Sequence, residues 1–361
     1  MKKYLLNLLT ISVFLASCSK KSDPAPTPEP PAPPPPTTNV PTPPTRTPWV
    51  PGTFKIVAYM PGYRDPATID DSKYKMITHL LYAFLAPSTT ADGSLQSLEH
   101  PTRFATVKAK AKANNLKFGI SIGPTLGATE NTYASIASSA TARTNFVNNI
   151  VAFAVNNELD GVDMDWEYPR TGGVNDTNPN NNFTLLMKEL STELRKVNKF
   201  LSAAITPAVY SSSNRYAIAQ EVYQYVDFFN IMQYDGAGYD TADLLNHAPY
   251  NMSVNSLNFW LNTRSMPKEK AVVGIPLYGK NSSGGSKGYR EFEASGADVY
   301  LNLATVNGIN YGYNGIELIW KKAQLAKERA NGIMFWEFSF DSNSSKSLIR
   351  AANDQLGRPY N

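Results

Sequence analysis

The 361-residue sequence contains a single cysteine, Cys18, and only three histidines. One cysteine excludes disulfide bonds within the chain, and it excludes metal sites built from several cysteines. A large excess of charge is also missing, because the formal net charge is +4 and most of it lies before residue 52. The rest of the chain therefore lacks the basic surface of a nucleic-acid-binding protein, and we expect no nucleic acid among its partners.

Long hydrophobic runs are missing as well, and the apolar stretch Tyr4 to Ala16 is too short for an ordinary membrane-spanning helix. It follows a basic start and ends in Leu15-Ala16-Ser17-Cys18, which resembles a bacterial lipobox. The resemblance implies that residues 1–18 are a signal peptide and that Cys18 is lipidated. We therefore expect anchoring in the bacterial cell envelope, on the periplasmic or surface face of an outer membrane. A plain signal peptide with a fortuitous cysteine, and hence secretion, is the alternative.

Residues 19–51 are rich in proline and threonine. Such a composition cannot bury a core, and it favours extended polyproline II backbone. The stretch is either a stiff tether or a disordered leader, and the composition is the same for both. The folded domain is therefore expected at residues 52–361.

From residue 54 onward, short β-type apolar runs alternate with longer helical patterns. Strands are predicted at 54–60, 77–85, 117–122, 160–167, 200–206, 226–234, 271–278 and 332–338. Helices are predicted at 103–114, 142–157, 182–197, 253–262, 315–330 and 345–355. This alternation is typical of an α/β fold with a parallel sheet, and its length favours a closed (β/α)8 TIM barrel. A doubly wound open sheet is the alternative, although no glycine-rich phosphate loop follows the first strand.

One predicted strand carries acids at alternate positions, in the run Asp160-Gly-Val-Asp-Met-Asp-Trp-Glu-Tyr-Pro. Side chains alternate between the two faces of a strand, so Asp163, Asp165 and Glu167 share one face. Crowded, desolvated carboxyls raise one another's pKa, and one that keeps its proton near neutral pH can act as a general acid. An exposed edge strand or a calcium site is the alternative, but further oxygen ligands are not clustered in this segment, and we predict no metal.

The spacing Asp-x-x-Asp-x-Asp-x-Glu resembles the signature of glycoside hydrolase family 18, which includes many chitinases. The resemblance covers roughly residues 54–341, and it implies retaining, substrate-assisted hydrolysis of β-1,4 bonds in N-acetylglucosamine-containing glycans. It implies that Glu167 protonates the glycosidic oxygen, that Asp165 orients the 2-acetamido group, and that Asp163 shares a proton with Asp165. The acetamido oxygen is the nucleophile, so no cofactor is implied.

Other segments fit the same family. Tyr234 and Asp235 end a Met-x-Tyr-Asp motif, which implies that Tyr234 bonds the acetamido oxygen and that Asp235 contacts sugar hydroxyls and the acid. Trp336 matches the tryptophan beneath the reacting sugar, and Phe84 ends a Tyr-Ala-Phe motif of the same pocket. The remaining substrate-binding candidates are Tyr59, Tyr278 and Ser121. For the aromatic candidates, a place in the hydrophobic core is the alternative.

Two features depart from the family pattern. Pro124 stands where the family often has the second glycine of Ser-x-Gly-Gly, so the loop beside the acids is altered. The interval from Tyr278 to Gly315 is short for the α+β domain that many members insert there. We therefore predict a single barrel without that insertion, with a shallow groove that suits cleavage within a glycan or a bulky, branched glycan.

The sequence leaves three functions open. A monomeric chitinase-like hydrolase acting on N-acetylglucosamine oligo- or polysaccharides is favoured. An endo-β-N-acetylglucosaminidase would cut the chitobiose core of N-glycans with the same residues. A non-catalytic, glycan-binding surface lipoprotein is the third, although such relatives often lose the acid that Glu167 supplies here. A Ser-His-Asp hydrolase is not supported, since no Gly-x-Ser-x-Gly elbow is present, and His79 is interpreted as structural.

Overall fold

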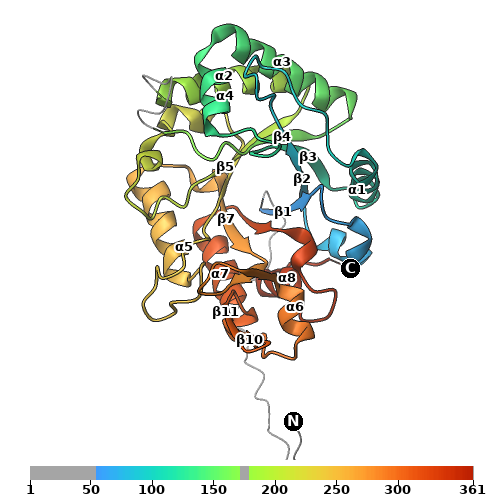
Figure 1. The fold of residues 1–361 in the computed structure, drawn as a ribbon, viewed down its shortest axis with the longest axis vertical. Coiled ribbons are helices and arrows are strands. Elements are labelled where there is room, and N and C mark those ends of the chain that lie inside the picture. The colour runs from blue at the N-terminus through green and yellow to red at the C-terminus, as the bar shows by residue number, and fades with distance from the viewer. Residues whose placement is uncertain (1–53, 171–178, 361) are drawn as a thin grey trace, which may run out of the picture. The chain divides into compact units, whose positions relative to one another are not determined.

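The computed structural model describes residues 54–170 and 179–360, and these contain a closed barrel of eight parallel strands (Figure 1). The order around the barrel is β1-β12-β7-β6-β5-β4-β3-β2, with parallel pairing throughout. The strands are β1 (Lys55–Pro61), β2 (His79–Leu85), β3 (Lys117–Ile122), β4 (Gly161–Met164), β5 (Phe200–Ile205), β6 (Phe228–Ile231), β7 (Ala271–Pro276) and β12 (Gly332–Trp336). The predicted TIM barrel is confirmed, and the open sheet is excluded.

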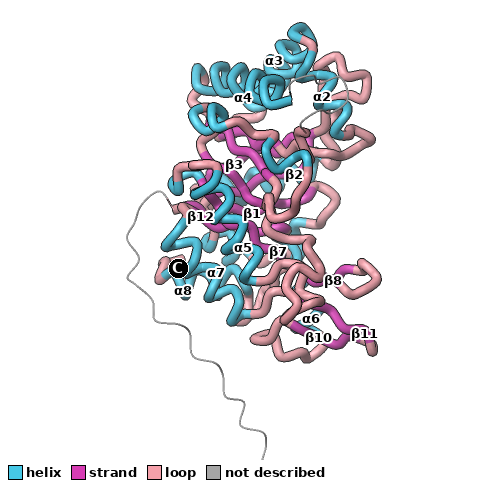
Figure 2. The backbone as a smooth tube through the Cα atoms, turned by 90° about the vertical axis from the view of Figure 1, so that its left-hand side faces the viewer, coloured by secondary structure: helices cyan, strands magenta, loops and turns pink. Residues whose placement is uncertain are grey.

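Helices surround the strands, with α3 and α4 on one side of the barrel and α7 and α8 on the opposite side (Figures 1 and 2). They are α1 (Pro101–Ala113), α2 (Glu130–Ser138), α3 (Ala140–Asn156), α4 (Pro179–Lys196), α5 (Tyr250–Leu257), α7 (Ile316–Arg329) and α8 (Leu348–Leu356). The sequence missed α2, whose serines, threonine and asparagine are weak helix formers. Within the described ranges, no helix is both long enough and apolar enough to cross a bilayer.

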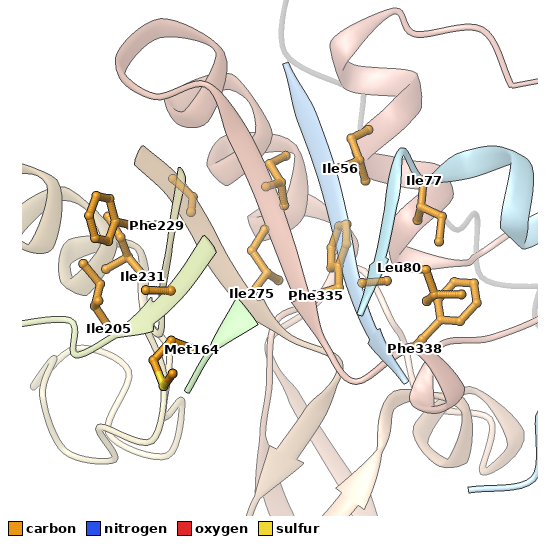
Figure 3. Close-up of a cluster of buried hydrophobic side chains, with 14 of the residues drawn as sticks. Ile56, Ile77, Leu80, Met164, Ile205, Phe229, Ile231, Ile275, Phe335 and Phe338 are labelled. Atoms are coloured by element: carbon orange, nitrogen blue, oxygen red, sulfur yellow. The ribbon is translucent and has the colours of Figure 1, made fainter. Parts of the chain in front are cut away.

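Each barrel strand has two buried faces, which produces two hydrophobic layers. On β1, Ile56 points outward into the large cluster between strands and helices, whereas Val57 and Tyr59 point into the barrel. Figure 3 shows part of the outer layer, where Ile231 and Phe335 lie near other large apolar side chains. Strands buried on both faces read as continuous apolar runs, which is why the strand positions were visible in the sequence.

The segment between β7 and α7 corrects one expectation. It forms a four-stranded antiparallel sheet, in the order β10-β11-β8-β9, together with one short helix (Figure 2). Its elements are β8 (Tyr278–Lys280), β9 (Ser286–Gly288), α6 (Tyr289–Ala294), β10 (Leu303–Val306) and β11 (Ile309–Gly312). The barrel therefore does carry a small α+β element, although it belongs to the same compact unit as the barrel.

A turn signal for this sheet was present in the sequence. Asn307 and Gly308 join β10 to β11 with φ values of 51° and 76°. Asn-Gly between two short β-type runs is the usual sequence of a two-residue hairpin with positive φ at both positions. The length of the segment between β7 and α7 does not indicate strands. The Asn307-Gly308 turn sequence is the feature that does.

Candidate active site

Strand β4 and the residues that follow it present three acids on one face, Asp163, Asp165 and Glu167, which we call the acid column. Trp166 points to the opposite face, where its ring stacks on Tyr133 of α2 at 5.8 Å. The backbone N–H of Asp165 donates to a carbonyl of β3 at 2.9 Å, which continues the strand pairing beyond the end of β4. The predicted alternation is therefore correct, although β4 itself ends three residues earlier than predicted.

Asp163 lies fully buried at the base of the acid column. Its Oδ2 accepts hydrogen bonds from the Tyr59 hydroxyl at 2.7 Å and the Ser121 hydroxyl at 2.8 Å. Its Oδ1 accepts from the Ser202 hydroxyl at 2.6 Å and from Asn230 Nδ2 at 3.3 Å. Burial raises the pKa of Asp163, and these four hydrogen bonds oppose the rise. Donors from β1, β3, β5 and β6 therefore fix this carboxyl group from across the barrel.

Asp165 is buried one step higher and lacks such support. Its Oδ1 has no hydrogen-bond partner among the described residues. Burial raises the pKa of Asp165 well above its usual value, and the neighbouring charges of Glu167 and Asp163 raise it further. Because an unpaired charge in this position is costly, Asp165 favours the protonated form, and its free oxygen is available to a ligand.

Glu167 is the outermost acid of the column and is partly exposed. Burial is the largest influence and raises the pKa of Glu167; a hydrogen bond with Tyr168 opposes the rise, and the negative charge of Asp235 adds to it. A carboxyl group that keeps its proton at higher pH, and that also reaches a cavity, meets the two requirements for a general acid.

Asp235 follows β6 and, unlike the acids of the column, has a positively charged partner. Its Oδ1 accepts a hydrogen bond from the Tyr278 hydroxyl at 2.6 Å and forms an ion pair with Lys280 Nζ at 2.7 Å. Partial burial acts to raise the pKa of Asp235, but the charge of Lys280 and the hydrogen bond from Tyr278 act against it, and that pKa lies well below its usual range. Asp235 therefore stays ionised beside an acid column that favours protons.

These groups surround a cavity of about 240 Å³ at the carboxyl ends of the barrel strands. Nearly half of its lining residues are aromatic, and Phe84 and Trp336 stack at 5.7 Å with an angle of 21° between their rings. Gly123 makes this stack possible, since a Cβ at that position would lie 2.1 Å from the Phe84 ring. The lining residues are Tyr59, Phe84, Pro124, Asp165, Glu167, Tyr168, Ala204, Met232, Tyr234, Asp235, Tyr278, Met334 and Trp336. Acids and flat apolar surface therefore meet in one open cavity, the pattern expected of a sugar-binding site.

Most predicted site residues meet in this cavity: Glu167, Asp165, Tyr234, Trp336, Asp235, Phe84, Tyr59 and Tyr278 all line it. Ser121 requires a correction, because its fully buried side chain bonds to Asp163 behind the wall instead of facing the substrate space. Asp163 also lies behind the wall. The chemical roles given to these residues stay predictions, and the lipidation residue Cys18 lies outside the described residues.

Two residues that the sequence singled out lie at the other end of the barrel. Asp160, the first acid of the motif, accepts the backbone N–H of Phe118 at 2.9 Å and pairs with Lys117 at 3.0 Å. His79 begins β2 and packs its ring against Phe200 and Phe228. Burial lowers the pKa of His79 to about 4, so it is neutral near pH 7. Both have structural surroundings, as predicted for His79.

Sequence reasoning missed the residues that support the site. Ser202 and Asn230 belong to β5 and β6, and only the barrel geometry shows that they point at Asp163. Lys280 and His247 come from segments in which the sequence predicted neither a strand nor a helix. Tyr168 carried a signal, because it follows Glu167 directly in the motif, yet it was not assigned a place in the site. Within the described ranges, no group of three or more His, Cys, Asp or Glu side chains has the arrangement of a metal site.

A closed (β/α)8 barrel with an acidic, aromatic cavity at the carboxyl ends of its strands has its cavity where TIM-barrel enzymes have their active sites. The model of glycosyl hydrolases family 18 matches residues 55–341. The chain therefore belongs to this family of glycoside hydrolases.

Individual relatives agree with this assignment. Chitinase 1 of Aphanocladium album is 27% identical over 348 residues, which cover 78% of this chain and 79% of that protein. The solved structure of the chitinase ChiB of Flavobacterium johnsoniae is 25% identical, with a TM-score of 0.69 over 84% of this chain and 94% of that one. A chitinase-like agglutinin of Robinia pseudoacacia, 22% identical, has a TM-score of 0.70 over 83% of this chain and 99% of its own, a likeness of fold alone.

The environment of Asp165 predicts a pH-dependent effect of Asp165→Asn on stability. The pKa of Asp165 is raised on folding from its usual 3.8, so the native state binds this proton more tightly than the unfolded chain. The free energy of unfolding of the wild type therefore falls as pH rises above the unfolded pKa. The fall is about 1.4 kcal/mol for each pH unit until the folded pKa is reached. We expect Asp165→Asn to be more stable than the wild type at pH 7, with the difference shrinking as pH falls toward 4 in urea-unfolding measurements.

Asp92→Asn is the contrasting control. Hydrogen bonds from Ser94 lower the pKa of the exposed Asp92, so this variant should lose stability at pH 7 and recover as pH falls. A difference between wild type and Asp165→Asn that does not vary with pH would contradict the assigned environment of Asp165.

Proposed function

We propose that this chain hydrolyses β-1,4 bonds of chitin or chito-oligosaccharides by substrate-assisted, retaining catalysis. The observation that carries the proposal is the acid column, with a proton-retaining Glu167 at the cavity and an unpartnered oxygen of Asp165 beside it. Glu167 donates its proton to the glycosidic oxygen as the bond to the anomeric carbon breaks. The substrate's own acetamido oxygen forms the new bond to that carbon, so no enzyme nucleophile is needed.

The second step returns the site to its starting state. Water attacks the anomeric carbon, the bond to the acetamido oxygen breaks, and the carboxylate of Glu167 accepts the proton released by the water. Asp165 accepts the acetamido N–H at its unpartnered oxygen, and it stabilises the positive charge that the group develops as its own proton is shared with Asp163. Tyr234 lines the same cavity, in a position suited to donating a hydrogen bond to the acetamido oxygen. Each role uses a residue that is already part of the cavity wall.

The remaining wall supports a sugar substrate. Trp336 and Phe84 offer flat apolar faces on which a pyranose ring packs, and ionised Asp235 is an acceptor for hydroxyl groups. The names of the relatives, two of which are chitinases, favour chitin among the possible glycans. The agglutinin shares only the fold, but it makes glycan binding without turnover the alternative that an experiment must address.

Glu167→Gln separates hydrolysis from binding. The amide keeps the shape of the side chain but has no proton to donate, so we expect kcat to fall by about 10²- to 10⁴-fold. The affinity for an N-acetylglucosamine hexamer, measured by calorimetry, should change little. Glu158→Gln is the matched control, because Glu158 is exposed and pairs with Lys108 and Lys112 away from the cavity. Hexamer binding by a wild type that shows no turnover would favour the glycan-binding alternative.

A mixed-substrate reaction identifies the glycan. The wild type would be incubated with the hexamer and a high-mannose N-glycopeptide together, and the products analysed by mass spectrometry. We expect shortened hexamers, including products of internal cleavage, and an intact glycopeptide. A glycopeptide trimmed to one N-acetylglucosamine would instead establish the N-glycan activity.

For location, we propose a lipid-anchored protein of the bacterial cell envelope, on the strength of the lipobox-like sequence that ends at Cys18. A chain with Cys18→Ser should lose incorporation of radiolabelled palmitate and leave the membrane fraction. Equal membrane association of both forms would refute the anchor.

A further inference from the structure

We infer that His247 is a positioning residue that holds Asp235 and Tyr278 in place beside the proton donor, Glu167. The inference rests on the proposed function, because its effect on catalysis passes through Asp235 to Glu167. His247 is fully buried in the loop between β6 and α5, and it does not line the cavity.

His247 is hydrogen-bonded to the backbone of the segment that follows β6. The backbone N–H of Asp235 donates to His247 Nδ1 at 3.1 Å, and the N–H of Gly236 donates to the His247 carbonyl at 2.8 Å. Asp235 has a φ of 64°, a left-handed conformation that is uncommon for a non-glycine residue and that local hydrogen bonds can support. The two hydrogen bonds provide this support at the residue whose side chain enters the site.

The other ring nitrogen of His247 contacts the chain where it leaves β7. His247 Nε2 lies 3.1 Å from the carbonyl oxygen of Tyr278, and the two rings pack at 4.7 Å. The Tyr278 hydroxyl returns to Asp235 Oδ1 at 2.6 Å, which closes a ring of contacts among three residues. The imidazole thus joins the ends of two neighbouring barrel strands at the edge of the cavity.

These partners define the tautomer of the imidazole. An N–H that points at Nδ1 requires a lone pair there, and a carbonyl beside Nε2 requires a proton there. Asp235 Oδ1 also lies 3.3 Å from Nδ1, but it already receives the donors of Tyr278 and Lys280. The structure therefore assigns the neutral ring with its proton on Nε2.

The loop that carries His247 is anchored to the barrel's outer helix. Ala248, the next residue, accepts hydrogen bonds at its carbonyl from Lys322 Nζ at 2.7 Å and from Asn314 Nδ2 at 3.0 Å. Its N–H donates to Asn246 Oδ1 at 3.0 Å. All of these side chains are fully buried, whereas nearly all of the loop before them is exposed or half-buried. This end of the loop, which carries His247, is therefore anchored by buried hydrogen bonds.

The position of Asp235 matters to the chemistry because its negative charge adds to the rise in the pKa of Glu167. Asp235 also lines the cavity and is placed to contact a sugar hydroxyl. If it moves, both the proton donor and the bound sugar are affected. Misplacement by about 1 Å of a group that contacts the reacting region can cost about 10²-fold in rate.

Three variants separate the two contacts of the ring. His247→Ala removes both, and we expect kcat for the hexamer to fall about 10²-fold, with a much smaller change in KM. His247→Asn restores an acceptor where Nδ1 stood and should recover most of kcat. His247→Gln places a donor near the Tyr278 carbonyl and should recover less, because the Asp235 N–H stays unbonded. His100→Asn, on an exposed histidine with φ of 52°, is the control and should be unchanged.

A readout independent of turnover uses the wild-type protein. With only three histidines in the chain, ¹⁵N-histidine labelling and NMR should show a buried ring with an unprotonated Nδ1 and a protonated Nε2. A proton on Nδ1, or His247→Asn no more active than a folded His247→Ala, would overturn the inference. A wild type without turnover would refute the proposed function, while the tautomer would still decide the arrangement of His247.

Discussion

The convergence of four hydrogen-bond donors on Asp163 is the interaction on which the site depends. Tyr59, Ser121, Ser202 and Asn230 come from four different strands and meet at one buried carboxyl group. Their convergence requires a closed barrel, since an open sheet would not bring β1 and β6 opposite β4. With Asp163 fixed, the alternation of the chain after β4 determines where the other two acids of the column lie.

The same arrangement places a cost on the folded protein. Asp165 is buried with an oxygen that no described residue satisfies, between two other acids. Replacing such a group usually increases stability but lowers activity. Destabilising groups are therefore kept where function requires them. The contrast with Asp235, whose charge is matched by Lys280 and hydrogen-bonded by Tyr278, separates an acid that holds a proton from one that stays ionised. Two carboxyl environments of opposite character in one cavity are what a proton-donating site needs.

The barrel strands and the acid column could be predicted from the sequence, for different physical reasons. Strands buried on both faces gave continuous apolar runs, and the acid motif gave the column, because strand alternation is a local property. Contacts between distant segments were not readable in this way. Ser121 was placed against the substrate, although the fold turns it toward Asp163, and His247 was overlooked, because its partners are backbone groups of Asp235 and Tyr278, which follow β6 and β7. The small sheet after β7 was missed because its strands are short, although Asn307-Gly308 marked its turn.

The stereochemistry of the products shows whether the substrate's acetamido group is the nucleophile above this acid column. Proton NMR of an N-acetylglucosamine hexamer digest, recorded in the first minutes, reports the anomeric configuration of newly formed reducing ends before they equilibrate. Two displacements at the same carbon retain the configuration, so we expect β-anomers. Initial release of α-anomers would mean a single displacement by water, and it would contradict the mechanism assigned to Asp165 and Glu167.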